Sequence, residues 1–425
     1  MNTTYMSAEE QSVSNNTVVY VFIFAFLALV VDGADLMFLA YSLKAITHEF
    51  NLTDFQAGTL GSFTLVGMAI GGAVGGYCLD RFGRVRTIVW SIAFFSVGTA
   101  ALGLTHNYWQ FALIRFCSSL ALGAVYLGAN ILMTEYVPTR FRSTVMGALV
   151  TGWTFGYILA AVLAGQIIPA HEDGWRWLFY VAIIPIFLTF FLYKLIPEPP
   201  SWVEAKAREK KARESSATGK VKQKSSFEII AEDPCSRNMF ILWMITSFCM
   251  LFGYYGVSNW MPSYLERELG MNFKSMTTYM VGSYVAMIAG KIIAGAAADI
   301  FGRRVVYAIG GIATAAFIFI IVYANTPENI VYLLIVFGFV YGINVAINTT
   351  YMAESFPTRF RGLAVGGSYN IGRIGAAIAP AGIGFIATHG SISLGFLVMG
   401  GAYLLTGLVP GLFISDRQYD PQKSS

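Results

Sequence analysis

Five ionisable side chains stand inside long apolar segments of this sequence, where their types and positions indicate the handling of protons and anions. The acids are Asp32 and Asp35, and the cations are Arg115, Lys291 and Arg373. On insertion scales a charged side chain at the centre of a lipid bilayer costs ~2.5 to 3.5 kcal/mol, so each should face a cavity or a partner. We take these five residues as the candidate functional groups.

Asp32 and Asp35 are three residues apart, which places both carboxylates on one face of a helix, about one turn from each other. Two carboxylates in a poorly solvated site disfavour ionising together, so one of them can hold a proton near neutral pH. Arg115 belongs to an apolar segment that runs the opposite way and lies at a matching depth. The pattern predicts either a proton-coupling set of these three residues or a static acid–arginine pair that holds two helices together.

Arg373 lies near the middle of its apolar segment, and no acidic residue lies within the C-terminal apolar segments to neutralise it. A planar guanidinium binds a carboxylate through two hydrogen bonds, so the natural counter-ion is a carboxylate on the substrate. Lys291 lies closer to the end of its segment. It either contacts a second anionic group or extends its ammonium toward the aqueous interface.

Neutral polar and aromatic side chains recur in the same segments. Tyr255 and Asn259 share a helical face at a spacing of four, as do Asn344 and Asn348. An aromatic wall with amide donors suits a flat organic acid. The predicted substrate-binding set therefore adds to Arg373 and Lys291 the following residues: Tyr255, Asn259, Asn344, Asn348, Asn370, Trp153 and Tyr157.

The segments that must position these residues are apolar helices. Of the 425 residues, 56% are hydrophobic and 12% are charged, whereas a soluble domain has about a quarter charged residues. A helix needs ~20 apolar residues to cross a bilayer. The stretches that meet this requirement are 18–41, 55–79, 86–104, 109–132, 143–168, 176–196, 238–263, 275–298, 304–323, 329–350, 362–386 and 391–414. The sequence thus predicts an all-α membrane protein with twelve transmembrane helices.

Basic residues divide the loops between these helices into two sets. Most of the 28 Lys and Arg residues fall in alternate loops, and the intervening loops hold only Lys44, Arg176, Arg267 and Lys274. Because basic loops stay in the cytoplasm, both termini and the long central loop are predicted to be cytoplasmic. The predicted organisation is a tail (1–17), an N-terminal six-helix half (18–196), a linker (197–237), a C-terminal six-helix half (238–414) and a tail (415–425).

Two sequence motifs occur twice with one common offset. The first motif, Gly76-Tyr-Cys-Leu-Asp80-Arg-Phe-Gly83-Arg84, returns as Gly295-Ala-Ala-Ala-Asp299-Ile-Phe-Gly302-Arg303, and 299 − 80 is 219. The second, from Glu135 to Arg142, returns from Glu354 to Arg361, and 354 − 135 is again 219. A shared offset indicates a duplicated half. Parallel repeats of six helices are how a large class of transporters builds a substrate site at the middle of the membrane.

With these motifs, and with Gly174-Trp-Arg-Trp177, the chain resembles the major facilitator superfamily. The resemblance implies a conformational latch, which stabilises one conformation of the transporter. The implied latch residues are Asp80, Arg81, Arg84, Glu135, Arg142, Asp299, Arg303, Glu354 and Arg361. The second copy departs from the family pattern at Ile300, so we expect the latch to be weaker there.

Within that superfamily, Asp32-Gly33-Ala34-Asp35 resembles the Asp-Gly-x-Asp motif of the aromatic acid:proton symporters. Members of that group import benzoate-like acids, hydroxybenzoates and ring-cleavage products such as muconate. In related carriers the acids of the first helix and the arginine of the fourth serve proton coupling. The resemblance therefore implies import of a small organic anion with protons by alternating access. We expect a monomeric, multi-pass protein of a bacterial inner membrane.

Three alternative functions fit the same residues: a sialic acid or monocarboxylate proton symporter, an exporter of anionic drugs, and a receptor that binds without transport. The sequence has no phosphate-binding loop, and its four histidines lie in loops or at span ends, so neither ATP-driven pumping nor enzyme activity is expected. Its four cysteines show no metal-ligand spacing. We expect no metal, no other cofactor and no nucleic acid partner.

Overall fold

The computed structural model describes residues 15–137, 142–193, 196–200, 202–204, 206–207, 234–357 and 361–416. These residues form α-helices with short 3-10 segments. Twelve helical spans among them are long and apolar enough to cross a membrane, which confirms the predicted fold class. Most of the predicted linker and of the two tails lies outside the described residues.

The N-terminal half contains six spans. Its helices are α1 (Asn15–Glu49), α2 (Asp54–Phe82), α3 (Arg84–Leu102), α4 (Tyr108–Tyr136), α5 (Arg142–Ile167), α6 (Gly174–Tyr180) and α7 (Ile184–Tyr193). The sequence predicts one unbroken helix for the sixth span, but a 3-10 turn at Val181–Ile183 separates α6 from α7. Pro185 stands at the start of α7, and because it has no backbone N–H it cannot donate to the carbonyl one turn earlier.

The C-terminal half repeats this arrangement. Its helices are α10 (Pro234–Arg267), α11 (Phe273–Phe301), α12 (Arg303–Tyr323), α13 (Ile330–Glu354), α14 (Arg361–His389) and α15 (Ile392–Phe413). The offset of 219 holds for helix boundaries as well as motifs. It relates both ends of α2 to those of α11, since 273 − 54 and 301 − 82 are both 219, and it relates the start of α5 to that of α14, since 361 − 142 is 219.

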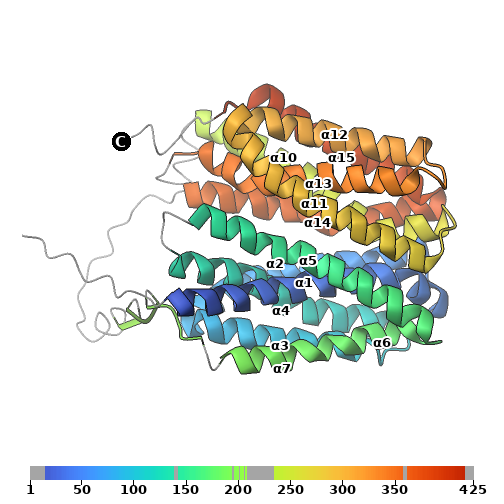
Figure 1. Ribbon diagram of the computed structural model, residues 1–425, viewed down its shortest axis with the longest axis horizontal. Helices are drawn as coiled ribbons and strands as arrows, with labels where there is room; N and C mark the ends of the chain where they lie inside the picture. Colours follow the sequence, from blue (N-terminus) through green and yellow to red (C-terminus); the bar gives the residue numbers. More distant parts are fainter. Residues whose placement is uncertain are drawn as a thin grey trace, which may run out of the picture.

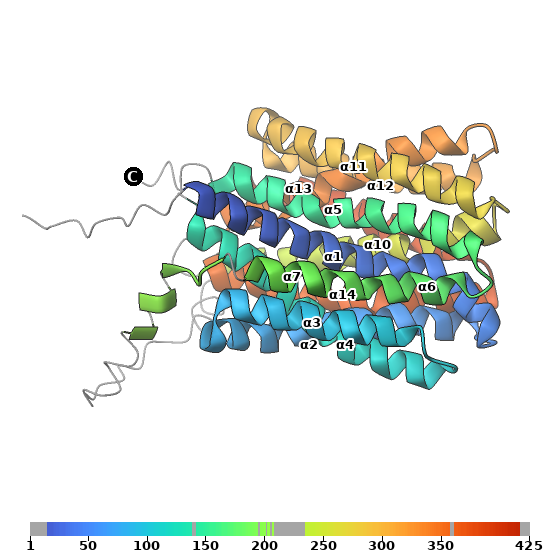
Figure 2. The same ribbon diagram turned by 60° about the horizontal axis from the view of Figure 1, so that its bottom comes forward.

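The two halves lie side by side in Figure 1, with α1 to α7 on one side and α10 to α15 on the other, and in Figure 2 the N-terminal half lies in front of α10 and α14. Within the halves, α2 packs on α4 as α11 packs on α13, and α1 packs on α5 as α10 packs on α14. Between the halves, α2 packs on α14 and α5 packs on α11. The repeat relates α2 to α11 and α5 to α14, so the contact of α2 with α14 is equivalent to the contact of α11 with α5.

Local sequence signals account for many helix ends. At one end of the bundle, Thr53, Asn107, Asn272 and Ser391 accept backbone N–H groups in the first turn of α2, α4, α11 and α15. At the other end a glycine joins each pair of consecutive helices in the repeated motif. Gly83 has a φ of 111° between α2 and α3, and the glycine that follows α11 has a φ of 91°. A side chain would strain the backbone there, which explains why the motif contains glycine.

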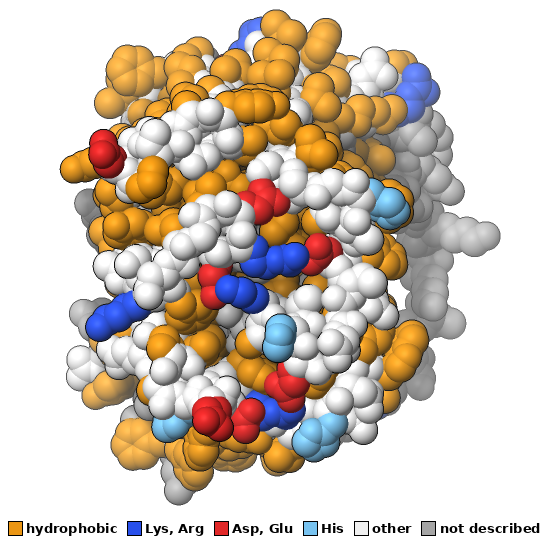
Figure 3. Space-filling model, turned by 90° about the vertical axis from the view of Figure 1, so that its right-hand side faces the viewer, with side chains coloured by type: hydrophobic (Ala, Val, Ile, Leu, Met, Phe, Trp, Pro, Cys, Tyr) orange, Lys and Arg blue, Asp and Glu red, His pale blue; other side chains and the backbone are white. Residues whose placement is uncertain are grey.

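We call the end of the bundle where α1 finishes the Asp54 end, and the opposite end the Asp80 end. At the Asp54 end, ion pairs join the halves: Lys44 Nζ is 2.9 Å from Glu266 Oε1, and Arg267 Nη1 is 2.5 Å from Asp54 Oδ1. Figure 3 shows acidic and basic side chains gathered across the middle of this end. The Asp54 end is therefore closed.

The Asp80 end of the bundle differs. Among the described residues, no hydrogen bond or ion pair joins the two halves on the Asp80 side of Lys291 and Arg373. Gly147 of α5 and Gly366 of α14 have no heavy atom within 4 Å of the position that a Cβ would take. The described residues of the two halves therefore make no polar contact with each other toward the Asp80 end.

Candidate functional site

Asp35 and Arg115 form a buried ion pair between α1 and α4. Arg115 Nη1 lies 2.8 Å from Asp35 Oδ2, and the two side chains are 0% and 2% exposed. Arg115 also donates to the Asp35 backbone carbonyl (3.1 Å) and to the Thr64 hydroxyl (3.0 Å), while Thr99 donates to the second oxygen of Asp35 (2.6 Å). Both charged groups are therefore satisfied by hydrogen bonds inside the N-terminal half, as a stable buried pair requires.

Asp32 stands one turn away from Asp35 in a different environment. Its side chain is completely buried, and neither carboxylate oxygen has a hydrogen-bond partner among the described residues. The guanidinium groups of Arg373 and Arg115 both act on it electrostatically. A buried carboxylate without partners is unfavourable when ionised, so this acid is suited to holding a proton that it can later release.

Arg373 of α14 reaches from the C-terminal half toward α2. Its guanidinium lies over the ring of Tyr369, 5.8 Å from the centroid, and its Nη1 is 2.9 Å from the position that a Cβ on Gly72 would take. Arg373 has no acid within ion-pair distance among the described residues, and its side chain is partly exposed. The missing side chain of Gly72 leaves the room that the guanidinium occupies.

Lys291 of α11 reaches the opposite half in the same way. Its ammonium donates to the Thr154 hydroxyl of α5 at 2.7 Å, and the residue is 7% exposed. The interpretation in which Lys291 extends to the aqueous interface does not describe this conformation. No acidic side chain of the described residues lies within ion-pair distance of it, and the hydrogen-bond partner that the structure gives its ammonium is a neutral hydroxyl.

Aromatic rings from both halves surround the charged groups. The rings of Trp153 and Tyr126 meet edge to face at 5.4 Å, and the ring of Tyr157 lies 5.2 Å from that of Tyr284 across the interface. Tyr157 has a buried hydroxyl without a hydrogen-bond partner among the described residues. Tyr255 and Arg373 interact electrostatically. Of the predicted aromatic residues, Tyr157 therefore lies on the boundary between the halves, Trp153 packs on Tyr126 within the N-terminal half, and Tyr255 lies near Arg373.

The sequence prediction did not include Tyr126, Tyr369 and Gly72. Tyr126 interacts electrostatically with both Asp32 and Arg373. A signal for Tyr369 is its spacing of four from Arg373, which places the two side chains on one helical face. A signal for Gly72 is its place in the repeat. The offset of 219 makes it equivalent to Lys291, so one half has a glycine where the other half has a long, charged side chain.

The four predicted asparagines occupy different places. Asn344 donates to the Tyr307 carbonyl (2.8 Å), and Asn348 accepts from the Tyr307 hydroxyl (2.7 Å), so both face α12 inside the C-terminal half. Figure 1 shows α12 on the side of that half away from α1 to α7. The structure therefore does not bring these two residues to the interface. Asn259 is buried against Gly61 of α2, and Asn370 is exposed.

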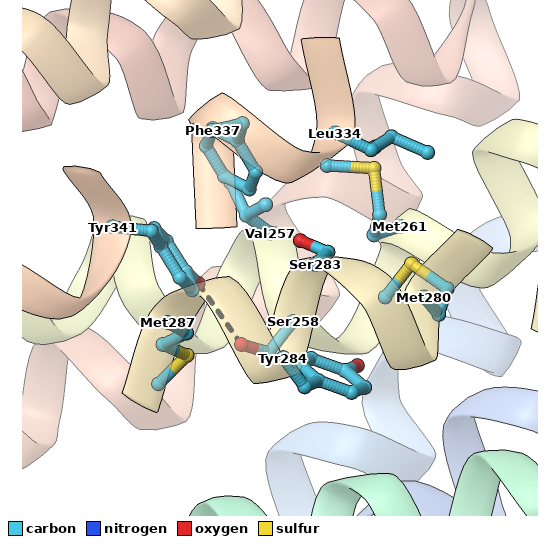
Figure 4. Close-up of a pocket in the computed structure, with 10 residues that line it drawn as sticks. All are labelled: Val257, Ser258, Met261, Met280, Ser283, Tyr284, Met287, Leu334, Phe337 and Tyr341. Carbon is cyan, nitrogen blue, oxygen red and sulfur yellow. Dashed lines mark hydrogen bonds between the residues drawn. The ribbon is translucent and has the colours of Figure 1, made fainter. Parts of the chain in front are cut away.

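A small pocket inside the C-terminal half is separate from the charged groups. It lies between α10, α11 and α13, with Met261, Met280 and Met287 among its lining residues (Figure 4). Its polar groups include the Ser258 hydroxyl, which is 2.9 Å from the Tyr341 hydroxyl. The lining contains no cation. The described lining of this pocket therefore offers an anion no cationic partner.

The first latch copy centres on Arg84. Its Nη1 is 3.1 Å from Asp80 Oδ1, and its Nη2 is 3.0 Å from Glu135 Oε1. Arg81 instead donates to the Tyr77 hydroxyl at 2.5 Å. The side chain of the predicted latch residue Arg142 lies outside the described part of the chain.

The second latch copy pairs the equivalent residues around Arg303. Its Nη1 is 2.6 Å from Asp299 Oδ1, and its Nε is 3.3 Å from Glu354 Oε2. The side chain of Arg361 is again outside the described part. Each of these ion pairs joins residues of one half, so none of them connects the two halves.

An acid beyond the last helix of each half, which the sequence prediction missed, completes each latch. Glu198 accepts the backbone N–H groups of Arg84, Val85 and Arg86 at 2.7 to 3.1 Å. In the second half Asp416 accepts the Arg303 N–H at 3.0 Å. An acid at a helix N-terminus is stabilised by the free N–H groups and the helix dipole. In each half, the predicted latch residues therefore join the second, third and fourth helices, and the added acid connects them to the chain that follows the sixth span.

No group of His, Cys, Asp and Glu side chains among the described residues is arranged to hold a metal ion. What the site offers is two acids, three cations and a set of aromatic rings at the middle of a twelve-helix bundle. Such a set can exchange a proton and bind an organic anion.

Comparison with known proteins places this fold and site in a class. The family model described as Major Facilitator Superfamily matches residues 25–289 and 267–425. A crystal structure titled as a D-xylose-proton symporter superposes with a TM-score of 0.76 at 18% sequence identity, covering 94% of this chain and 99% of that one. This second likeness shows the fold. The molecule is a two-half, multi-pass membrane protein, and the chain belongs to the major facilitator superfamily.

Two curated relatives, both from Acinetobacter baylyi, are similar along nearly their whole length. The protein named cis,cis-muconate transport protein is 56% identical over 420 residues, which are 99% of this chain and 100% of that protein. The protein named benzoate transport protein is 25% identical over 434 residues, covering 95% of this chain and 91% of that protein. Both relatives are named as transporters of carboxylic acids, one with two carboxylates and one with a single carboxylate.

Proposed function

We propose that this protein imports a small organic acid, an aromatic or unsaturated carboxylate, together with protons by alternating access. The observation that carries the proposal is the position of Arg373: a cation at the boundary between the halves, close to Asp32 and without an acidic partner among the described residues. The relative with 56% identity is named for cis,cis-muconate, so this conjugated dicarboxylate is the first substrate to test.

Asp32 and Arg373 together supply a mechanism for coupling. When Asp32 is ionised, it attracts the Arg373 guanidinium and competes with a substrate carboxylate for it. When Asp32 is protonated, the competition ends and the guanidinium can bind the substrate. Substrate and proton therefore bind together and leave together. Asp35 and Arg115 fix the local geometry of α1 and α4, because their hydrogen bonds are already satisfied.

The charge of the loops supports an orientation of the protein in the membrane. The basic loops lie at the Asp80 end, so we assign that end, with both chain termini and the central linker, to the cytoplasm. Ion pairs join the halves at the Asp54 end, so we assign this structure to an inward-facing conformation. To face outward, the halves must rock so that the ion pairs of Lys44 with Glu266 and of Arg267 with Asp54 separate, while the Asp80 end closes.

The other expectations fit this assignment. Two six-helix halves at 18–196 and 238–414, linked through residues 197–237, act as the rocking bodies. Each half contributes part of one central site, so a monomer is sufficient for transport. The charged residues form no catalytic set among the described residues, and the proposed activity is transport without chemical conversion of the substrate. We place the protein in a bacterial cytoplasmic membrane.

The test is uptake by purified protein in proteoliposomes. With an acidic exterior, radiolabelled cis,cis-muconate or benzoate should accumulate inside above its external concentration, and a protonophore should abolish the accumulation. Saturable binding without accumulation would identify a receptor and contradict the proposal. Transport of sialic acid in preference to either carboxylate, or accumulation that runs only opposite to the proton gradient, would support the sialic acid carrier or the exporter instead.

A further inference from the structure

We propose that Lys291 and Arg373 form a two-point clamp that selects dicarboxylates, with one carboxylate bound by each cation. The inference rests on the proposed function, because it specifies how many charges the transported acid carries at the same site. It starts from the two contacts that these cations make across the interface between the halves.

The two contacts are copies of each other. Arg373 Nη1 lies 2.9 Å from the Cβ position of Gly72, and Lys291 Nζ lies 2.7 Å from the Thr154 hydroxyl. Gly72 and Lys291 are equivalent positions, because 291 − 72 is 219, and Thr154 and Arg373 are equivalent, because 373 − 154 is 219. The internal repeat therefore maps one contact onto the other. In one contact the cation is Arg373 of α14, and in the other it is Lys291 of α11.

This equivalence relates the two cations by the symmetry of the repeat. Parallel repeats of this superfamily are related by an axis along the membrane normal, so equivalent positions lie at equal depth on opposite sides of the axis. Since the Arg373 guanidinium lies at Gly72 and the Lys291 ammonium at Thr154, the two cationic groups form a symmetric pair, one on each side of the axis. A linear dicarboxylate has an anionic group at each end. Lying across the axis, it can place one carboxylate at each cation.

Lys291 also lacks the contacts of a structural lysine. It is 7% exposed, its described partner is a neutral hydroxyl, and the acids of the N-terminal half are engaged elsewhere or lie near Arg373. A buried cation without an acid destabilises the empty protein. Binding of a carboxylate relieves this penalty, whereas a structural role would require an acidic partner already in place. In this proposal Arg373 binds the first carboxylate of the substrate, and Lys291 binds the second.

The experiment compares ligands that differ by one charge and variants that differ by one side chain. Equilibrium binding of cis,cis-muconate and of its monomethyl ester is measured by calorimetry at one pH on purified protein. Lys291→Met removes the charge but keeps a side chain of similar length, and Lys291→Arg keeps the charge. The control is Lys274→Met, which replaces an exposed lysine of the same helix. Binding of the ester also shows that a variant is folded.

The clamp predicts that Lys291→Met loses about 30-fold or more in muconate affinity, the effect of removing one partner of a buried charge pair. Its affinity for the ester should change by less than about threefold, and its melting temperature without ligand should rise because a buried unpaired charge is gone. Lys291→Arg should keep the preference for muconate, and Lys274→Met should match the wild type.

Equal losses for both ligands in Lys291→Met, or no loss for either, would overturn the clamp. So would a wild-type protein that binds the ester as tightly as the dicarboxylate. These results leave the proposed function standing as long as benzoate is accumulated in response to a proton gradient. Failure of proton-driven uptake of every carboxylate would instead contradict the proposed function itself.

Discussion

The two halves of the molecule share helix order, helix boundaries and latch motifs, but they differ in the charges at their centre. The N-terminal half contains Asp32, Asp35 and Arg115, of which the last two neutralise each other. The C-terminal half contains Lys291 and Arg373 and no acid in the same region among its described residues. The helices of both halves could pack with the same residues at equivalent positions. A difference in charge between equivalent positions therefore indicates a functional role.

The comparison indicates a division of labour. The N-terminal half carries the acid that can exchange a proton, and the C-terminal half carries the cations that can hold an anion. Because Arg373 and Asp32 interact across the boundary, the two roles are linked at the place where the halves meet. Coupling between proton and substrate then depends on two side chains from different halves.

The largest effect is expected for the ion pair within the N-terminal half. Asp35→Asn leaves Arg115 buried without its acidic partner, which should lower the free energy of unfolding by ~3 to 5 kcal/mol. Thermal unfolding of the purified protein in detergent measures this loss. Asp32→Asn is the matched control on the same helix, because Asp32 has no hydrogen bonds among the described residues that the change could break. A smaller loss for Asp35→Asn than for Asp32→Asn would contradict the assigned roles.

The second effect concerns the anion site of the C-terminal half. Arg373→Ala leaves a desolvated substrate carboxylate without its partner, a penalty of ~2 to 5 kcal/mol, or ~30-fold or more in affinity. Equilibrium binding of muconate and benzoate measures the loss, which should appear for both acids. Arg237→Ala, at an exposed position of α10, serves as a control with wild-type affinity. Unchanged binding in Arg373→Ala would show that neutral groups hold the ligand.

A smaller effect is expected at Gly72. In Gly72→Ala the new methyl group would lie 2.9 Å from Arg373 Nη1, so the guanidinium must shift. Because it is the flexible end of a long side chain, the protein should keep its stability, while affinity for the substrate should fall by about three- to tenfold, or up to ~1.4 kcal/mol. Gly76→Ala, whose nearest contact is 3.5 Å, is the control one turn away. Equal affinities for the two variants would show that the position of the guanidinium is not critical.

Much of the architecture was predictable from the sequence, because hydropathy and the repeat offset each report on long segments. The pairing of an acid on α1 with Arg115 was also predictable, since the two helices run in opposite directions and the residues lie at matching depth. The sequence could not decide which of Asp32 and Asp35 is paired, because both share one face and the choice depends on a fraction of a turn.

Two other features were beyond the sequence for physical reasons. A spacing of four shows that Asn344 and Asn348 share a face, but it does not give the direction of that face, which here points to α12. Likewise, Gly72 carries no side chain chemistry of its own. Its role emerges only when Arg373 from the other half occupies the space beside it.

The central claim, that the proton site and the anion site lie in different halves, is tested most directly by Asp32→Asn in proteoliposomes. Two quantities are compared in one preparation: accumulation of muconate driven by a pH gradient, and exchange of labelled for unlabelled muconate without a gradient. The account predicts that accumulation is lost and exchange persists, since Arg373 still binds the anion while the amide cannot release a proton. Normal accumulation, or loss of exchange in a variant that remains folded, would contradict it.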